Sequence, residues 1–218
     1  MKTAVTDNDY ECPKKIAARQ ATIIEPYREL FGFEVPSDKQ YWTMCGRSAE
    51  DDGTFKIKSE LGQTLEAGLI KPNQFHGVER KKDWFKLNQA CRNDVNWYCG
   101  DFFSVMEENK TKGRFSPAIV NADLITMPET SMPYIANIMD LLSRGNAPVM
   151  FVVNLVLDSR FRDMQTTDMA ISSLQEHRQY KSAMRKKDWN LYKNGEYLYK
   201  GSGEKSKTIM GTLVFYFR

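Results

Sequence analysis

Residues 75–106 contain two short apolar runs that each end in an acidic residue. The first run, residues 75–78, is followed by Glu79, and the second, residues 95–99, is followed by a glycine and Asp101. The polar stretch between them has the length and composition of a helix. Two strands joined by a helix form half of a βαβ unit, and ligands of open α/β sheets bind just beyond the carboxyl ends of the strands. The segment therefore predicts a nucleotide-binding edge in an α/β fold.

The two acids suit the recognition of an adenosine. One carboxylate can accept hydrogen bonds from both hydroxyls of a ribose, and a second can accept from the exocyclic amine of an adenine. Each acid also has a purely structural interpretation. Glu79 could form a surface salt bridge with Lys81 or Lys82, and Asp101 could cap the helix that we expect to begin at Phe102.

Composition limits the class of protein without naming its function. The chain has 218 residues, of which 41% are hydrophobic, and this indicates one folded domain with a substantial core. The net charge of +3 permits contact with a phosphate backbone but does not argue for it, because charges of both signs are mixed along the chain. No apolar run approaches the roughly 20 residues needed to cross a bilayer, and residues 1–15 lack the apolar core of a secretion signal. We therefore expect a cytoplasmic protein.

Cysteine and histidine usage argues against a metal site. The four cysteines show no CxxC spacing, and the chain has two histidines, so we expect no zinc site. Cys45 and Cys99 fall at expected strand ends, and we interpret them as buried free thiols of a reducing compartment. His76 is expected to pack within or beside a strand.

Hydrophobic periodicity predicts strands that alternate with helices along most of the chain. A helix is expected at residues 13–33, with a kink or break at Pro26. Strands are expected at residues 40–45, 75–79, 95–99, 117–124 and 149–157, with helices between them. A long helix at residues 163–187 then precedes an antiparallel hairpin of residues 190–200 and 207–217. The most apolar strand, residues 149–157, is expected in the centre of the sheet.

This order, together with the phrases YWTMCG, FHGVER, YCGDFF and IVNADL, resembles class I S-adenosylmethionine-dependent methyltransferases over roughly residues 40–218. The resemblance implies a Rossmann-like three-layer sandwich with a mostly parallel seven-stranded sheet and a C-terminal antiparallel hairpin. It implies one domain, residues 1–218, in which residues 1–35 form an N-terminal helical extension. It also implies S-adenosylmethionine as the cofactor. The phrases are similar to methyltransferases encoded by bacteriophages, which would place the protein in a host cytoplasm.

By this resemblance, Glu79 is the ribose-binding acid and Asp101 the acid on the adenine side. Phe102 would lie against the face of the adenine. Capping of a helix by Asp101 and contact of Asp101 with adenine are compatible.

The resemblance also assigns the methionine part of the cofactor to the loop after the first strand, at Cys45 and Gly46. Family members normally have several glycines and an acid there, whereas this loop has one glycine and no acid on the strand. A plain strand-to-loop turn is the alternative. Ser59 is expected to cap a helix, and its neighbour Glu60 is a further candidate for the amino-acid end of the cofactor.

Asp123 ends the fourth expected strand, at the position that the resemblance assigns to catalysis. Methyl transfer is an in-line displacement, so positioning and a proton acceptor are the main requirements. Asp123 could instead simply cap the next turn. The motif Pro-Pro-aromatic of amino-methylating DNA enzymes and the Pro-Cys nucleophile of cytosine C5 enzymes are both absent from the sequence.

The segment around His177 is rich in basic residues. One interpretation is a phosphate-contacting helix with Tyr180 and Trp189 as stacking partners; its cations are Arg178, Lys181, Arg185, Lys186 and Lys187. A solvated helix face is the simpler interpretation and is favoured. The scattered basic loops and this aromatic-basic helix make nucleic acid the slightly favoured methyl acceptor, and no membrane partner is expected.

Two classes of function remain open. The leading hypothesis is methyl transfer from S-adenosylmethionine. The alternative is a catalytically inactive binding or regulatory protein of viral origin that has kept the fold, since a fold alone does not decide activity. A nucleotide-binding oxidoreductase fits less well, because it would have three glycines after the first strand.

Overall fold

The computed structural model describes residues 13–46, 48–50, 52–124, 128–157, 166–200 and 207–218. Its centre is a seven-stranded sheet in the order β3-β2-β1-β4-β5-β7-β6. The strands are β1 (Gln40–Met44), β2 (Phe75–Glu79), β3 (Asn96–Cys99), β4 (Pro117–Leu124), β5 (Val149–Leu157), β6 (Asn190–Lys200) and β7 (Lys207–Phe217). Strands β1 to β5 are parallel, and β7 is antiparallel to both β5 and β6. The predicted fold class is confirmed.

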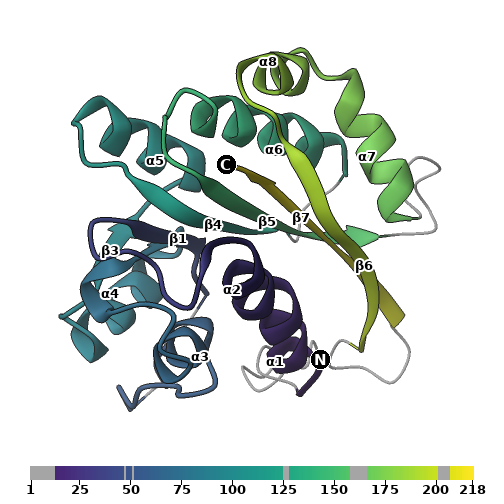
Figure 1. Cartoon of the computed structure of the whole chain (residues 1–218). Helices are drawn as coiled ribbons and strands as arrows, with labels where there is room; N and C mark the ends of the chain where they lie inside the picture. The colour runs from purple at the N-terminus through teal and green to yellow at the C-terminus, as the bar shows by residue number, and fades with distance from the viewer. Residues whose placement is uncertain (1–12, 47, 51, 125–127, 158–165, 201–206) are drawn as a thin grey trace.

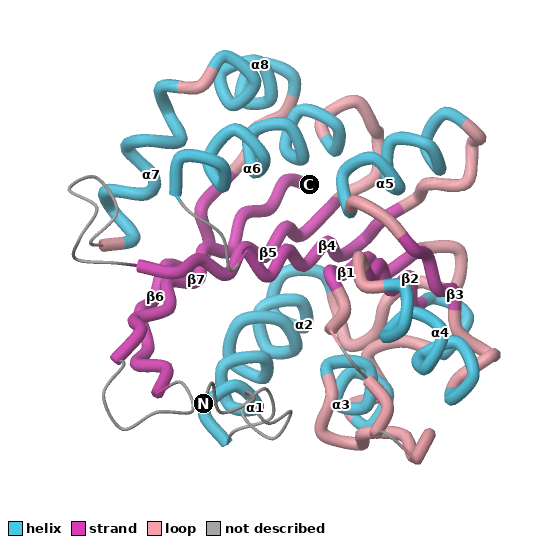
Figure 2. The backbone as a smooth tube through the Cα atoms, turned by 180° about the vertical axis from the view of Figure 1, so that it is seen from behind, coloured by secondary structure: helices cyan, strands magenta, loops and turns pink. Residues whose placement is uncertain are grey.

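Helices cover both faces of this sheet (Figures 1 and 2), and the molecule therefore has three layers. One face carries α1 (Pro13–Arg19), α2 (Glu25–Phe31), α3 (Glu60–Glu66) and α4 (Lys82–Cys91). The other face carries α5 (Phe102–Thr111), α6 (Pro128–Leu142), α7 (Thr167–Glu176) and α8 (Arg178–Lys186). None of the described helices is long and apolar enough to span a membrane.

Alternation along the strands divides the apolar residues between two cores. Tyr41 and Trp42 are neighbours on β1 and point to opposite faces of the sheet, because successive side chains of a strand alternate. Tyr41 packs in the core on the α1–α4 side and Trp42 in the core on the α5–α8 side, and both are fully buried. Strand β5 is buried on both faces over most of its length, as its apolar sequence predicts.

The N-terminal extension runs as one helical stretch from α1 to α2 through a π-helical turn, η2 (Gln20–Ile24). Pro26 lacks an N–H, and its ring would clash with the carbonyl four residues earlier in a regular α-helix. The wider turn precedes this proline, and the backbone N–H of Glu25 donates to the carbonyl of Gln20. Ile23 and Tyr27 are buried in the core. The extension is thus an integral part of the α1–α4 layer.

His76 on β2 confirms the prediction that it packs in the sheet. It is 6% exposed, its ring stacks on Trp42 with centroids 4.5 Å apart, and its Nδ1 lies 3.1 Å from the hydroxyl of Tyr98. Burial lowers the pKa of His76 to about 4, so the imidazole is neutral at physiological pH.

The prediction of one long helix at residues 163–187 is wrong. Residues 163–165 lie outside the described residues, and the remainder forms α7 and α8, which are separated at His177. The backbone of His177 is extended (φ −73°, ψ 134°), so that it ends α7 and precedes the first turn of α8. Both helices pack against α6.

Candidate functional site

The carboxyl ends of β1, β2 and β3 meet at one edge of the sheet, called here the carboxyl edge. Glu79 and Cys99 are register partners on the adjacent parallel strands β2 and β3, and Asp101 follows two residues later. The N–H of Gly100 donates to the carbonyl of Glu79 over 3.1 Å. The two acids therefore lie on neighbouring strand ends, as predicted. Strand order reverses between β1 and β4, and this switch point is where open α/β sheets bind ligands.

The carboxylate of Glu79 is 7% exposed and is oriented by the backbone. Its Oε1 accepts from the N–H of Lys81 over 2.7 Å. Burial raises the pKa of Glu79, and hydrogen bonds from the N–H groups of Lys81 and Arg80 oppose that shift. The ammonium of Lys81 lies over the ring of Trp84, 3.5 Å from its centroid. Glu79 therefore contacts the backbone N–H of Lys81.

Asp101 caps α5, which confirms its structural interpretation. Its Oδ1 accepts from the N–H and the hydroxyl of Ser104, both over 3.0 Å. Its Oδ2 accepts from the hydroxyl of Tyr134 over 3.1 Å, and that hydroxyl accepts from the N–H of Phe103 over 2.8 Å. Tyr134 comes from α6, and no sequence pattern signals this contact. The Asp101 carboxylate is thus held in one orientation by residues from two helices.

The expected position of Phe102 requires correction. Its side chain is 2% exposed and belongs to the core on the α5–α8 side, so its ring has no free face for an adenine. The N-cap at Asp101 sets the phase of α5, and this phase turns Phe102 inward. Phe103 is the half-buried aromatic of this turn, and its ring packs edge-on to Tyr134 with centroids 6.3 Å apart.

The loop after β1 is held by a side chain rather than by glycines. Asn88 of α4 is 1% exposed; its amide donates to the carbonyl of Gly46 over 3.0 Å, and its oxygen accepts from the N–H of Ser48 over 2.8 Å. Gly46 has a negative φ, and a Cβ placed on it would meet no atom within 4 Å. Gly46 is therefore not required by a tight turn, and the space before its backbone is open.

Two of the cysteines at the carboxyl edge differ in burial. Cys45 is buried with its Sγ 3.2 Å from the hydroxyl of Ser48, and burial raises the pKa of its thiol to about 12. A neutral buried thiol does not act as a nucleophile. Cys99 is exposed, so the prediction that both thiols are buried is wrong for Cys99. The reason is topological, since Cys99 ends the edge strand β3.

A network of partly buried hydrogen bonds runs across the strands on the α1–α4 face of the sheet. Glu60, in the first turn of α3, accepts from the hydroxyl of Tyr41 over 2.7 Å and from the amide of Asn121 over 2.9 Å. The oxygen of Asn121 accepts from Asn154, whose own oxygen accepts from the hydroxyl of Thr212. Ser59 caps α3 as predicted. The Glu60 carboxylate is thus bonded within the protein, and this network joins α3 to β1, β4, β5 and β7.

Asp123 lies on β4 at the same end of the sheet. It is half-buried, it is two residues beyond Asn121, and its register partner is Asn154 of β5. Because side chains two residues apart share a face, Asp123 faces the α1–α4 side with Asn121. Residues 125–127, which follow shortly after Asp123, lie outside the described residues. Asp123 therefore remains the candidate on the acceptor side.

The α8 segment does not present Tyr180 and Trp189 as stacking partners, which was the less favoured of its two interpretations. Tyr180 and Trp189 are 8% and 5% exposed, and the indole N–H of Trp189 donates to the hydroxyl of Ser143 over 2.7 Å. Lys186 donates to Asp140 over 2.6 Å. These contacts lie beside the end of α6 that leads into β5. This is where the amino ends of the parallel strands lie, called here the amino edge. The segment is therefore remote from Glu79 and Asp101.

Comparison with solved structures supports the fold assignment. The chain matches M. jannaschii TYW2 in complex with AdoMet with a TM-score of 0.52 and 9% identity, over 100% of this chain and 80% of that chain. It matches a SAM-dependent methyltransferase from Anabaena variabilis ATCC 29413 with a TM-score of 0.50 and 9% identity, over 100% of both chains. No protein-family model and no curated protein matches the chain.

The strand order, the antiparallel β7 and these structural neighbours define a Rossmann-like methyltransferase fold of class I. At this level of identity the likeness establishes the fold alone.

Proposed function

We propose that this protein binds S-adenosylmethionine at the carboxyl edge and transfers its methyl group to an acceptor. The observation that carries the proposal is the placement of Glu79 and Asp101 at the ends of adjacent parallel strands, β2 and β3, beside the switch point of a methyltransferase fold. Both carboxylates are held in fixed orientations by hydrogen bonds from the protein. The reaction would take place in the cytoplasm, and a bacteriophage source is part of the same proposal.

The residues at this edge fit the parts of the cofactor. Glu79 would hold the ribose hydroxyls, and Asp101 with the first turn of α5 would face the adenine. The backbone of Cys45 and Gly46 would border the methionine part, since the space in front of Gly46 is open. When bound, S-adenosylmethionine supplies an electrophilic methyl group on a sulfonium. The charge of Glu79 also complements that cation.

Asp123 is the proposed residue next to the acceptor. It lies at the carboxyl end of β4, on the far side of β1 from Glu79, so that a cofactor lying across the β1 loop would reach towards it. A carboxylate there can orient the acceptor group and take up a proton that the acceptor releases.

A second candidate function is binding without turnover. The observation that favours it is the β1 loop, which has one glycine in an ordinary backbone conformation and is fixed by Asn88. A protein that only senses S-adenosylmethionine or S-adenosylhomocysteine would need the same adenosine contacts but no acid at Asp123.

Isothermal titration calorimetry with S-adenosylmethionine and S-adenosylhomocysteine tests the proposal. We expect both to bind the wild-type protein, and Glu79→Ala to raise Kd by about 100-fold or more, because two hydrogen bonds to a charged acceptor are lost. Glu108→Ala is a matched control at an exposed carboxylate of α5. It should leave Kd unchanged.

The outcomes separate the candidate functions. No binding of either ligand by the wild-type protein would overturn the proposal, as would an unchanged Kd for Glu79→Ala. Normal binding by Asp123→Asn with loss of methyl transfer would support Asp123 as the acceptor-side residue. Binding by the wild-type protein without turnover on RNA, DNA or protein extracts would favour the sensor.

A further inference from the structure

Residues 80–86, which link β2 to α4 and form the first turns of α4, carry an exposed group of cations, called here the α4 cationic face. It consists of Arg80, Lys81, Lys82 and Lys86, which are all exposed, and Asp83 is the one acid among them. The segment begins directly after Glu79. The cations therefore lie at the carboxyl edge, where the proposed methyl transfer takes place.

Two cations of this face have no ionic partner among the described residues. Lys82 and Lys86 are four residues apart on one side of α4, a spacing at which like charges repel. Within the described part of the chain, no ion pair involves either residue. Lys82 also stands in the first turn of α4, where the helix dipole disfavours a cation. These two charges are therefore available to an anionic partner.

The cations at the amino edge differ from those of the α4 cationic face, because they have partners within the protein. Arg144 and Lys186 both donate to Asp140, over 2.6 Å in each case. The ammonium of Lys110 donates to the carbonyl of Leu141 over 2.7 Å, and Lys187 lies over the ring of Phe217. These charges are committed to contacts within the protein.

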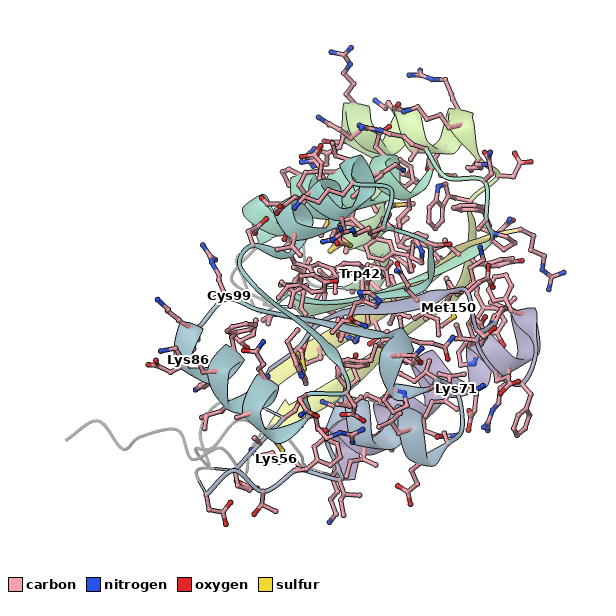
Figure 3. All side chains as sticks on the ribbon, turned by 90° about the vertical axis from the view of Figure 1, so that its left-hand side faces the viewer. Trp42, Lys56, Lys71, Lys86, Cys99 and Met150 are labelled. Carbon is pink, nitrogen blue, oxygen red and sulfur yellow. The ribbon has the colours of Figure 1, made fainter. Side chains whose placement is uncertain are left out.

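The position of the α4 cationic face suits an acceptor that must reach the proposed cofactor site. Burial raises the pKa of the Tyr134 hydroxyl, and the nearby charge of Arg80 opposes that shift slightly. Tyr134 in turn donates to Asp101. Figure 3 shows Lys86 and Cys99 on the same side of the molecule, and Lys71 and Met150 on the opposite side. Lys82 and Lys86 are separated by about 6 Å along the helix axis. Over that distance one nucleic-acid strand presents about two phosphates.

We propose that the α4 cationic face binds the phosphate backbone of a nucleic acid and thereby brings the methyl acceptor to the carboxyl edge. This inference rests on the proposed function, and it moves the nucleic-acid surface from α8 to α4. Trp84, half-buried beneath the ammonium of Lys81, gives the face an aromatic component that an acidic peptide would not need.

The test measures binding of a fluorescein-labelled single-stranded RNA by anisotropy between 50 and 200 mM salt, a range over which counterion release is measurable, at about micromolar protein. The test variant is Lys82→Gln with Lys86→Gln, because glutamine keeps the helix propensity. The matched control is Lys71→Gln with Lys112→Gln, which removes two exposed charges at the amino edge. A second comparison variant is Arg185→Gln with Lys187→Gln at the C-terminal end of α8.

Loss of two phosphate contacts should weaken binding by about 20-fold at 0.1 M salt and reduce the slope of log K against log salt by about 1.4. Both comparison variants should stay within about twofold of wild type. An equal loss in the amino-edge control would show non-specific attraction, and a larger loss in the α8 variant would move the site to α8; either result overturns the proposal. Tight binding of poly-glutamate by the wild-type protein, weakened in the test variant as much as RNA binding is, would also overturn the proposal.

Two further measurements identify the kind of nucleic acid and separate this inference from the proposed function. The same titration with single-stranded DNA and with duplex RNA separates the sources of phosphate, and one of the three should bind at least tenfold more tightly through this face. Calorimetry with S-adenosylhomocysteine should give the same Kd for the test variant and wild type. Failure of nucleic-acid binding with intact S-adenosylhomocysteine binding would overturn this inference alone, and the reverse pattern would overturn the proposed function instead.

Discussion

Glu79 and Cys99 are direct register partners on neighbouring parallel strands, and the carboxylate is buried whereas the thiol is exposed. A ligand whose ribose contacts Glu79 therefore passes beside the sulfur atom of Cys99. The pair offers a chemical reporter at the proposed adenosine site.

We predict that S-adenosylhomocysteine protects Cys99 from alkylation. At a ligand concentration ten times its Kd, the rate of modification by iodoacetamide should fall by about tenfold, in proportion to the free site. Peptide-level mass spectrometry measures the rate at each cysteine. Cys45 is the internal control, because its buried thiol has a pKa raised to about 12 and should stay unmodified with or without ligand. An unprotected Cys99 would place the ligand elsewhere.

Tyr134 is predicted to fix the Asp101 carboxylate. Tyr134→Phe removes a donor to Asp101 and an acceptor for the N–H of Phe103, so we expect a loss of about 1 kcal/mol in the free energy of unfolding and weaker binding of S-adenosylhomocysteine. Urea denaturation and calorimetry measure the two effects. Tyr98→Phe is the matched control. It removes a hydroxyl bonded to His76 and should lower stability without changing Kd.

The sequence predicted the sheet far better than the contacts between distant segments. Strand ends at Glu79 and Cys99 follow from local apolar runs and turn residues. The bond from Tyr134 to Asp101 spans 33 residues and the bond from Asn121 to Glu60 spans 61, and both depend on how helices dock on the finished sheet. Local sequence patterns do not predict contacts that depend on such docking.

Two errors at the site have the same physical origin. The exposure of Cys99 depends on β3 being an edge strand, and the inward direction of Phe102 depends on where α5 begins. The period of two residues in a strand, or of 3.6 in a helix, predicts which side chains share a face. It does not predict which neighbouring segment covers that face.

His76 is predicted to make stability depend on pH. Its pKa is lowered to about 4 in the folded protein from an ordinary value of 6.5. Between these values the unfolded chain binds more protons, so the contribution of His76 is fully present above pH 6.5 and is lost as the pH falls towards 4. The expected loss is about 3 kcal/mol. Urea denaturation of wild type and His76→Phe from pH 7.5 to 4.5 measures it, and the stability difference between them should shrink or reverse in favour of the variant at low pH. A constant difference would contradict the assigned pKa.

Thr43 on β1 is predicted to be a site where a polar group lowers stability. Its hydroxyl is buried and, among the described residues, is the one buried side-chain donor or acceptor that has no hydrogen-bond partner. Thr43→Val keeps the shape and removes the unpaired hydroxyl, so the free energy of unfolding should rise by about 1 kcal/mol. Thr212→Val is the matched control, because the Thr212 hydroxyl donates to Asn154 over 2.8 Å, and this substitution should lower stability by about 1 kcal/mol or more. Guanidinium denaturation of both variants measures the two changes. A loss of stability in Thr43→Val equal to that in Thr212→Val would show that Thr43 has a partner in solution, and calorimetry with S-adenosylhomocysteine would then tell whether that partner is the ligand.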